Sequence, residues 1–209
     1  MPPEKVQLKV PYYCQIYDMP TGCELVSARM ALEYYGVKVS YDDILKHLNR
    51  SDLSVDKKGR LYGLSPNQAF IGSPKTNSGF GCYPQVIADM ITSMELDGVR
   101  VDDTSSLRLD FVAETYLTLG FPVLVWATIG MGDAPETDSW YLVDQNGKIT
   151  KEKYTWLANE HCLVMVGYDK NYYYFNDPLA GYATVKYSRE LVEKRYKEIG
   201  SYSLVIRND

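Results

Sequence analysis

The sequence has no long apolar segment and no strongly basic one. No apolar run reaches the roughly 18 residues of a membrane-spanning helix, and residues 1–5 lack the apolar core of a signal peptide. The formal net charge is -5, and the longest basic cluster is Lys57-Lys58-Gly59-Arg60. This balance argues against nucleic acid or an anionic membrane as the partner. We therefore expect neither a membrane-spanning segment nor a nucleic-acid partner.

Cysteine and histidine are scarce. The four cysteines are scattered without a CxxC pair: Cys14, Cys23, Cys82 and Cys162. Their spacing predicts neither a zinc site nor a dense disulfide framework, so we expect no metal and no cofactor. The two histidines are His47 and His161, and any catalytic imidazole has to be one of them.

The order of predicted elements indicates an α+β protein. The 209 residues, of which 45% are hydrophobic, suffice for one well-cored domain spanning 1–209. Helical spacing and cap signals predict helices over 23–36, 41–48, 84–96, 106–119 and 188–198. Alternating or continuous apolar patterns predict strands over 6–13, 37–39, 121–129, 161–168, 172–176, 182–187 and 201–207. The Asn146-Gly147 turn predicts a hairpin over 140–156. The irregular segment 49–83, rich in glycine and aromatic residues, predicts an ordered, cleft-forming loop. Helices thus precede an antiparallel sheet.

The stretch that organises the chain is Pro20-Thr21-Gly22-Cys23-Glu24, a tight turn that leads into the first predicted helix. Cys23 then lies in the first turn of that helix. There, unpaired backbone N–H groups and the positive end of the helix dipole favour a thiolate over a thiol. The sequence therefore predicts a reactive sulfur at Cys23, with a pKa below the ordinary value of about 8.5.

A base and an orienting acid follow from the predicted hairpin. His161 opens an apolar strand, and Asp177 ends the next strand after a turn at 169–171, so antiparallel pairing brings the two side chains within reach. A carboxylate beside an imidazole fixes its tautomer and stabilises the imidazolium. The alternatives are a core histidine bonded to backbone and an Asp-Pro turn residue; His47, late in a polar helix, is the weaker candidate base.

An acyl-transfer site also needs donors for an oxyanion. Gln15 lies one loop before Cys23, where its amide can join the backbone N–H of Cys23. Cys14 precedes an irregular loop and so lacks a helix dipole, while strand alternation points Cys162 into the core on the face opposite His161. Glu24 and Glu160 flank the Cys23–His161 pair in sequence, and we expect them to be structural hydrogen-bond partners.

At these residues the chain resembles the bacterial papain-like cysteine peptidases related to the bacteriocin-processing double-glycine peptidases. The matching segments run nearly end to end: Gln15, Pro20-Thr21-Gly22-Cys23-Glu24, Gly79-Phe80-Gly81, Glu160-His161-Cys162-Leu163-Val164-Met165-Val166-Gly167-Tyr168-Asp169 and Asn176-Asp177-Pro178. The resemblance implies a papain-like fold, in which a helical lobe carrying the nucleophile packs on an antiparallel β-sheet. By the same resemblance Cys23 is the nucleophile, His161 the base and later the acid, Asp177 the orienting group and Gln15 the oxyanion donor.

These inferences predict a cysteine peptidase or other thiol hydrolase that cleaves a peptide or amide bond through an acyl-enzyme thioester. Its partner is then a peptide or protein substrate. Two alternatives stay open: an acyltransferase or transglutaminase-like use of the same site, and a non-catalytic peptide- or glycan-binding surface domain. Nothing in the sequence resembles the transporter to which bacteriocin-processing peptidases are usually fused. Standalone relatives suggest a secreted or cell-surface protein of a Gram-positive bacterium, with a cytoplasmic location as the alternative.

Overall fold

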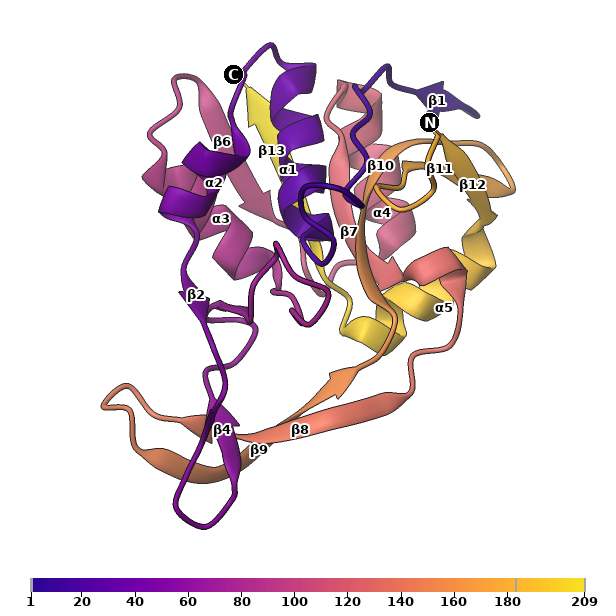
Figure 1. Ribbon diagram of the computed structural model, residues 1–209. Coiled ribbons are helices and arrows are strands. Elements are labelled where there is room, and N and C mark those ends of the chain that lie inside the picture. Colours follow the sequence, from indigo (N-terminus) through magenta and orange to yellow (C-terminus); the bar gives the residue numbers. More distant parts are fainter. Residues whose placement is uncertain (1, 183, 209) are drawn as a thin grey trace.

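A seven-stranded antiparallel sheet forms the centre of the molecule (Figure 1). The computed structural model describes residues 2–182 and 184–208. The strand order is β12-β11-β10-β7-β13-β6, and β1 pairs with the end of β10 on the edge opposite β11, beyond the residues that pair with β7. The strands are β1 (Val6–Gln7), β6 (Val99–Asp103), β7 (Val123–Thr128), β10 (Glu160–Tyr168), β11 (Tyr172–Asn176), β12 (Val185–Ser188) and β13 (Ser203–Asn208).

Helices cover both faces of this sheet (Figure 1). On one face lie α1 (Cys23–Tyr34) and α3 (Pro84–Ser93), with α2 (Tyr41–His47) packed on α3; on the other lie α4 (Leu109–Tyr116), the short 3-10 turn η1 (Leu117–Leu119) and α5 (Arg189–Ile199). A hydrophobic core lies on each face of the sheet, and β10 contributes to both. Its residues Cys162 and Val164 pack toward α1, while Leu163 and Met165 pack toward α4 and α5. Burial on both faces explains why its sequence is continuously apolar. None of the helices in the described ranges has the length and hydropathy of a membrane span.

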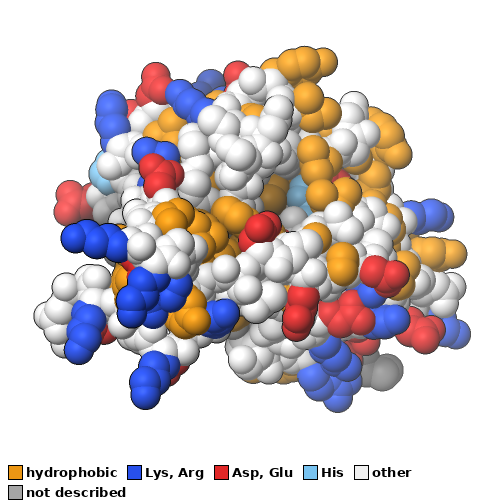
Figure 2. All heavy atoms as spheres, turned by 60° about the horizontal axis from the view of Figure 1, so that its bottom comes forward, with side chains coloured by type: hydrophobic (Ala, Val, Ile, Leu, Met, Phe, Trp, Pro, Cys, Tyr) orange, Lys and Arg blue, Asp and Glu red, His pale blue; other side chains and the backbone are white. Residues whose placement is uncertain are grey.

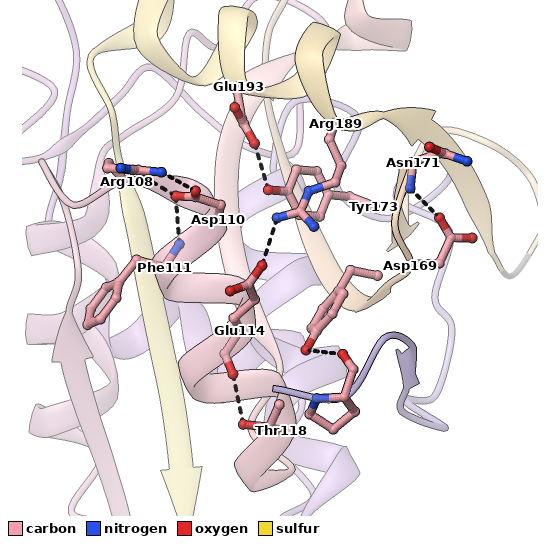
Figure 3. Close-up of polar contacts among 12 residues, drawn as sticks. Arg108, Asp110, Phe111, Glu114, Thr118, Asp169, Asn171, Tyr173, Arg189 and Glu193 are labelled. Carbon is pink, nitrogen blue, oxygen red and sulfur yellow. Dashed lines mark hydrogen bonds and ion pairs between the residues drawn. The ribbon is translucent and has the colours of Figure 1, made fainter. Parts of the chain in front are cut away.

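Polar contacts join the elements on the α4–α5 face (Figure 3). Arg189, the first residue of α5, donates to Glu114 of α4 at 3.1 Å, and the hydroxyl of Tyr173 in β11 donates to Glu193 at 2.8 Å. A partly exposed ion pair such as Arg189–Glu114 contributes little stability, about 0–1 kcal/mol. The apolar packing of Val192, which is fully buried in the core on this face, therefore contributes more to stability.

A long hairpin extends from the sheet at the lower end of the view in Figure 1. It consists of β8 (Glu136–Val143) and β9 (Ile149–Leu157), and it joins β4 (Leu61–Gly63) and β3 (Ser54–Val55) in a four-stranded sheet. Its apolar side chains pack against the segment that follows the short parallel pair β2 (Arg50–Ser51) and β5 (Phe70–Ile71). Phe80 lies against both Trp140 and Trp156, with ring centroids 5.3 and 5.5 Å apart. The hairpin therefore supplies one wall of the region around Gly81.

Several predicted elements are confirmed. Ser40 caps α2 through a complete capping box with Asp43, and the Asn146-Gly147 turn closes the β8–β9 hairpin, in which Val143 pairs with Ile149. The strand predicted over 182–187 occurs as Val185–Ser188, and residue 183 lies outside the described residues. The predicted class, α+β, is the class of the structure.

Other predictions were wrong. The strand over 6–13 ends at Gln7, because the carbonyls of Val10 and Pro11 accept hydrogen bonds from the Asn176 amide instead of a strand partner. Residues 37–39 form no strand; Val39 is buried in the core without a ladder. The charged segment Val99–Asp103 was missed, although it pairs with β13 as the edge strand β6. The loop predicted over 49–83 contains four short strands.

A buried hydrogen bond links the central sheet to the loop before α3, and it gives a test of the fold. The indole N–H of Trp126 in β7 donates to the carbonyl of Cys82 at 2.9 Å. We expect Trp126→Phe to lower the free energy of unfolding by about 1–3 kcal/mol, because the buried carbonyl loses its donor. Urea unfolding should show a lower midpoint with an unchanged slope. Tyr17→Phe, at a side chain 89% exposed, is the control and should leave the midpoint in place; equal midpoints for both variants would contradict the assignment.

Candidate active site

Helix α1 begins at Cys23, as the sequence predicts. Gly22 is its N-cap and offers no capping side chain, and the Gly22 N–H closes the preceding turn on the Met19 carbonyl at 2.8 Å. Cys23 is only 5% exposed. The N–H groups of the first helical turn have no acceptors within the helix, so the backbone at Cys23 has a donor to offer to a ligand beside it.

His161 and Asp177 are brought together by the register of β10 and β11. These strands are antiparallel, with Val164 opposite Asn176, so Asp177 follows β11 beside the start of β10. Nε2 of His161 lies 2.7 Å from Oδ1 of Asp177, and both side chains are buried. Burial by itself raises the pKa of Asp177, but the hydrogen bond and charge of His161 outweigh it and lower that pKa below its ordinary value. The pairing leaves Nδ1 as the ring nitrogen for proton transfer.

Gln15 is buried in the loop between β1 and α1. Its backbone N–H donates to the carbonyl of Pro178 at 3.0 Å, which ties this loop to the residue after Asp177. Its amide Nε2 donates to the Pro20 carbonyl at 2.8 Å, and its Oε1 is buried without a hydrogen-bond partner among the described residues. One N–H of the amide is thus used to hold the side chain, and the second is available.

Gln15, Cys23 and His161 line one cleft of about 160 Å³. Figure 2 shows the face on which it opens, with a hollow between hydrophobic side chains in which a histidine is visible. The other lining residues are Pro20, Thr21, Gly79, Phe80, Ile129, Trp156, Asn159, Glu160 and Leu179. Asp177 is not part of the lining and lies behind His161. A larger hollow of about 560 Å³ lies over the start of α4, and its walls include neither cysteine nor histidine.

The sulfur of Cys23 is held by groups other than His161. Sγ donates to Oε2 of Glu24 at 3.4 Å and accepts from the backbone N–H of Cys162, also at 3.4 Å. Within residues 2–182 and 184–208, no hydrogen bond joins Sγ to the imidazole. Burial first, and then the charges of Glu24 and Glu160, raise the pKa of the Cys23 thiol well above its ordinary value. The predicted low pKa is therefore wrong for this conformation, because desolvation and two carboxylates outweigh the helix dipole.

The pair Glu24 and Glu160 is the part of the site that the sequence reasoning missed. Glu24 is a hydrogen-bond partner as predicted, since its Oε1 accepts from the Cys82 N–H at 2.7 Å. Glu160 differs, because its Oε1 is buried without a partner among the described residues. The only signal was that the two glutamates flank Cys23 and His161 in sequence, and nothing in the sequence places them side by side.

The remaining candidates lie outside the cleft. His47 is bonded through Nδ1 to Ser93 at 2.9 Å at an exposed site. Cys162 packs in the core on the α1 face, as strand alternation predicts, and Cys82 is buried as well. Cys14 is partly buried; like the other three cysteines, it is a free thiol.

Comparison with known proteins identifies the family of this chain. The chain belongs to the Peptidase_C39-like family, whose model matches residues 7–204. It is 29% identical over 186 residues to the uncharacterized protein YvpB of Bacillus subtilis (strain 168), covering 89% of this chain and 69% of that protein. It also matches the crystal structure of a candidate C39-like peptidase from Bacillus anthracis with a TM-score of 0.81 and 26% identity, covering 99% of this chain and all of that one.

The surroundings of the Cys23 thiol predict its alkylation behaviour. Only the thiolate reacts, so labelling of the wild type by iodoacetamide should rise with pH and reach its midpoint above the ordinary thiol value of about 8.5. Glu24→Gln removes a negative charge beside the sulfur, so the midpoint should move to lower pH. Peptide mass spectrometry separates Cys23 from the other thiols.

Cys14 is the internal control, because its labelling should not differ between the wild type and Glu24→Gln. A wild-type midpoint below about 8.5 would instead support the helix-dipole expectation.

Proposed function

We propose that this protein is a cysteine peptidase with a papain-like fold, which cleaves a peptide or amide bond through Cys23, His161 and Asp177. The observation that carries the proposal is that the buried His161–Asp177 pair opens on the same small cleft as the residue that begins α1. A nucleophile, a base and a group that orients the base are the parts that covalent acyl transfer requires. Family membership supports the same activity.

Before attack, the sulfur has to turn from Glu24 toward the cleft. Rotation about the Cα–Cβ bond of Cys23 moves Sγ without moving α1, since one side-chain torsion controls its position. His161 then takes the thiol proton on Nδ1, while Nε2–H donates to Asp177 and stabilises the imidazolium. In the resulting pair the sulfur contacts the imidazolium of His161 instead of the carboxyl group of Glu24. The positive charge stabilises the thiolate and so lowers the pKa of the thiol.

The chemical steps follow from this pair. The thiolate attacks the carbonyl carbon of the substrate, and the negative charge develops on the carbonyl oxygen. The C–N bond breaks as His161 gives its proton to the leaving amine, which leaves a thioester on Cys23. Water then attacks the thioester, His161 takes a proton from it, and the C–S bond breaks to release the carboxylate and restore the sulfur.

The cleft can take the reacting part of a peptide substrate. Phe80, Ile129, Trp156 and Leu179 give it apolar walls, which exclude water from the reacting carbonyl. Its volume of about 160 Å³ holds the scissile region and not a whole peptide, so the flanking substrate residues lie on the surrounding surface.

A secreted or surface location in a Gram-positive bacterium stays a prediction.

Substitution of the proposed catalytic residues tests this function. The wild type incubated with a peptide library should yield cleaved products, which mass spectrometry detects, and Cys23→Ala should yield none. Asp177→Asn should lower kcat by up to about 10⁴-fold, because the imidazole loses the group that fixes its tautomer. An added amine distinguishes the outcomes further, since conjugated products would indicate acyl transfer to an amine.

Cys14→Ala is the matched control and should keep full activity, because Cys14 does not line the cleft. Cleavage by Cys23→Ala at the wild-type rate would refute the proposed nucleophile. An absence of both cleaved and conjugated products with the wild type would favour a binding protein.

Gln15 is the proposed side-chain donor to the oxyanion, together with the N–H of Cys23. Gln15→Ala should lower kcat by about 10²- to 10³-fold with little change in KM, as expected when a donor acts only in the transition state. Thermal unfolding of this variant has to match that of the wild type, because Gln15 also holds the Pro20 carbonyl. A loss confined to KM would assign Gln15 to substrate binding instead.

A further inference from the structure

Three ligand-type atoms converge beneath the cleft. Sγ of Cys23 and one carboxylate oxygen each from Glu24 and Glu160 lie within 4.8 Å of one another, and all three residues are buried. They come from the first turn of α1 and from the start of β10. The cluster lies on the α1 side of β10, whereas His161 follows Glu160 and points to the other face of the strand.

The two carboxyl groups differ in their partners: Glu24 accepts from the Cys82 N–H and from Sγ of Cys23, whereas Glu160 has an oxygen without one within the ranges that the structure describes. Glu160 is 8% exposed and its Oε1 has no hydrogen-bond partner among the described residues, although the side chain is directed into the cluster. No arginine or lysine pairs with either glutamate in the described part of the chain. Because an unpaired carboxylate is costly in a buried site, these groups need either protons or a bound cation.

Gly81, which has no side chain, leaves room for the carboxyl groups of Glu24 and Glu160. A Cβ at this position would lie 2.6 Å from Oε1 of Glu24 and 3.2 Å from Oε2 of Glu160, and Gly81 has a φ of +153°, which disfavours other residues. A side chain here would therefore clash with the carboxyl group of Glu24 and crowd that of Glu160. Glycine at this position lets both acids approach the sulfur.

We propose that Cys23, Glu24 and Glu160 bind a divalent cation of the Zn²⁺ class, which holds the sulfur in its buried position and so blocks the site reversibly. A thiolate with two carboxylates suits Zn²⁺, whereas Mg²⁺ and Ca²⁺ prefer oxygen ligands alone. Binding displaces the thiol proton and any carboxyl proton to solvent, and no redox change is involved. The blocking effect rests on the proposed peptidase function, but binding of the ion does not.

The distances fit such a site. Tetrahedral Zn²⁺ with a sulfur at about 2.3 Å and an oxygen at about 2.0 Å separates those two ligands by about 3.5 Å, and Sγ of Cys23 lies 3.4 Å from Oε2 of Glu24. Glu160 has only to move its carboxylate closer to this pair to become the third ligand. Because Cys23 and Glu160 also line the cleft, the ion has an entry path and water can take the fourth position.

Cobalt is a spectroscopic probe of this site. Titration of the reduced 209-residue chain with Co²⁺ should give one equivalent of binding and a thiolate-to-cobalt absorption band, which Zn²⁺ then abolishes by displacement. Cys23→Ala should remove the band, and Glu160→Gln, which keeps the shape of the side chain, should weaken binding at least about tenfold. Circular dichroism and thermal unfolding of each variant establish that it is folded.

Two matched controls decide which residues hold the ion. Cys82→Ala removes a buried thiol near the same carboxylates, and His161→Ala removes the imidazole of the cleft; both should bind Co²⁺ as the wild type does. If His161→Ala loses the ion while Glu160→Gln keeps it, the ion binds between Cys23 and His161 and the proposal is wrong. The absence of a thiolate–cobalt band in the wild type would mean that the cluster holds protons only, and would also overturn it.

Peptidase activity gives an independent readout. Zn²⁺ should inhibit the wild type, and Glu160→Gln should require at least about tenfold more Zn²⁺ for the same inhibition. Stoichiometric binding of Co²⁺ without any peptidase activity would count against the proposed function and leave the metal site standing. Full peptidase activity without metal binding would support the proposed function and overturn the metal site.

Discussion

The antiparallel pairing of β10 is the constraint on which the rest of the site depends. On one edge this strand pairs with β7 over residues 160–165 and with β1 at residues 167–168, and on the other edge it pairs with β11 between residues 164 and 168. Beyond the pair Val164–Asn176, however, β11 has ended and one edge of β10 is open. The start of α1 fills that edge, where Cys23 accepts the N–H of Cys162. The same register places Asp177 beside His161, so one strand end brings together the proposed nucleophile, base and orienting acid.

The state of the thiol follows from a competition between opposing electrostatic effects. A helix N-terminus stabilises a negative charge by about 0.3–1 kcal/mol, and up to about 2 kcal/mol in favourable partly buried sites. Full burial shifts a pKa by up to about 3–5 units, at about 1.4 kcal/mol for each unit, and the carboxylates of Glu24 and Glu160 act in the same direction. Burial therefore prevails while the sulfur faces these acids. Burial also raises the pKa of Glu24 itself to about 7.

The cleft is assembled from segments that are far apart in the sequence. Gln15 comes from the loop before α1, Phe80 from the segment before α3, and Trp156 from the long β8–β9 hairpin. Each is held by local packing: Phe80 contacts Trp156 edge to face, and Gln15 is bonded through its backbone to Pro178. This member of the Peptidase_C39-like family thus has its candidate reactive groups on the central sheet and α1, and its apolar walls on the surrounding hairpin and loops. Cys23 and His161 lie on regular elements, whereas Gln15 and Asp177 lie in the loops next to them.

The sequence by itself determined the α+β class, the helix that begins at Cys23 and the hairpin that pairs His161 with Asp177, because local periodicity, a turn and a short connection decide these features. Tertiary structure alone decided where the sulfur points and which acids surround it. Glu24 and Glu160 are 136 residues apart, and Cys82 and Gly81 approach them from a third segment. Such a cluster depends on the packing of α1 against the open edge of β10. The spacing of residues within one segment does not specify how deeply the side chains of this cluster are buried.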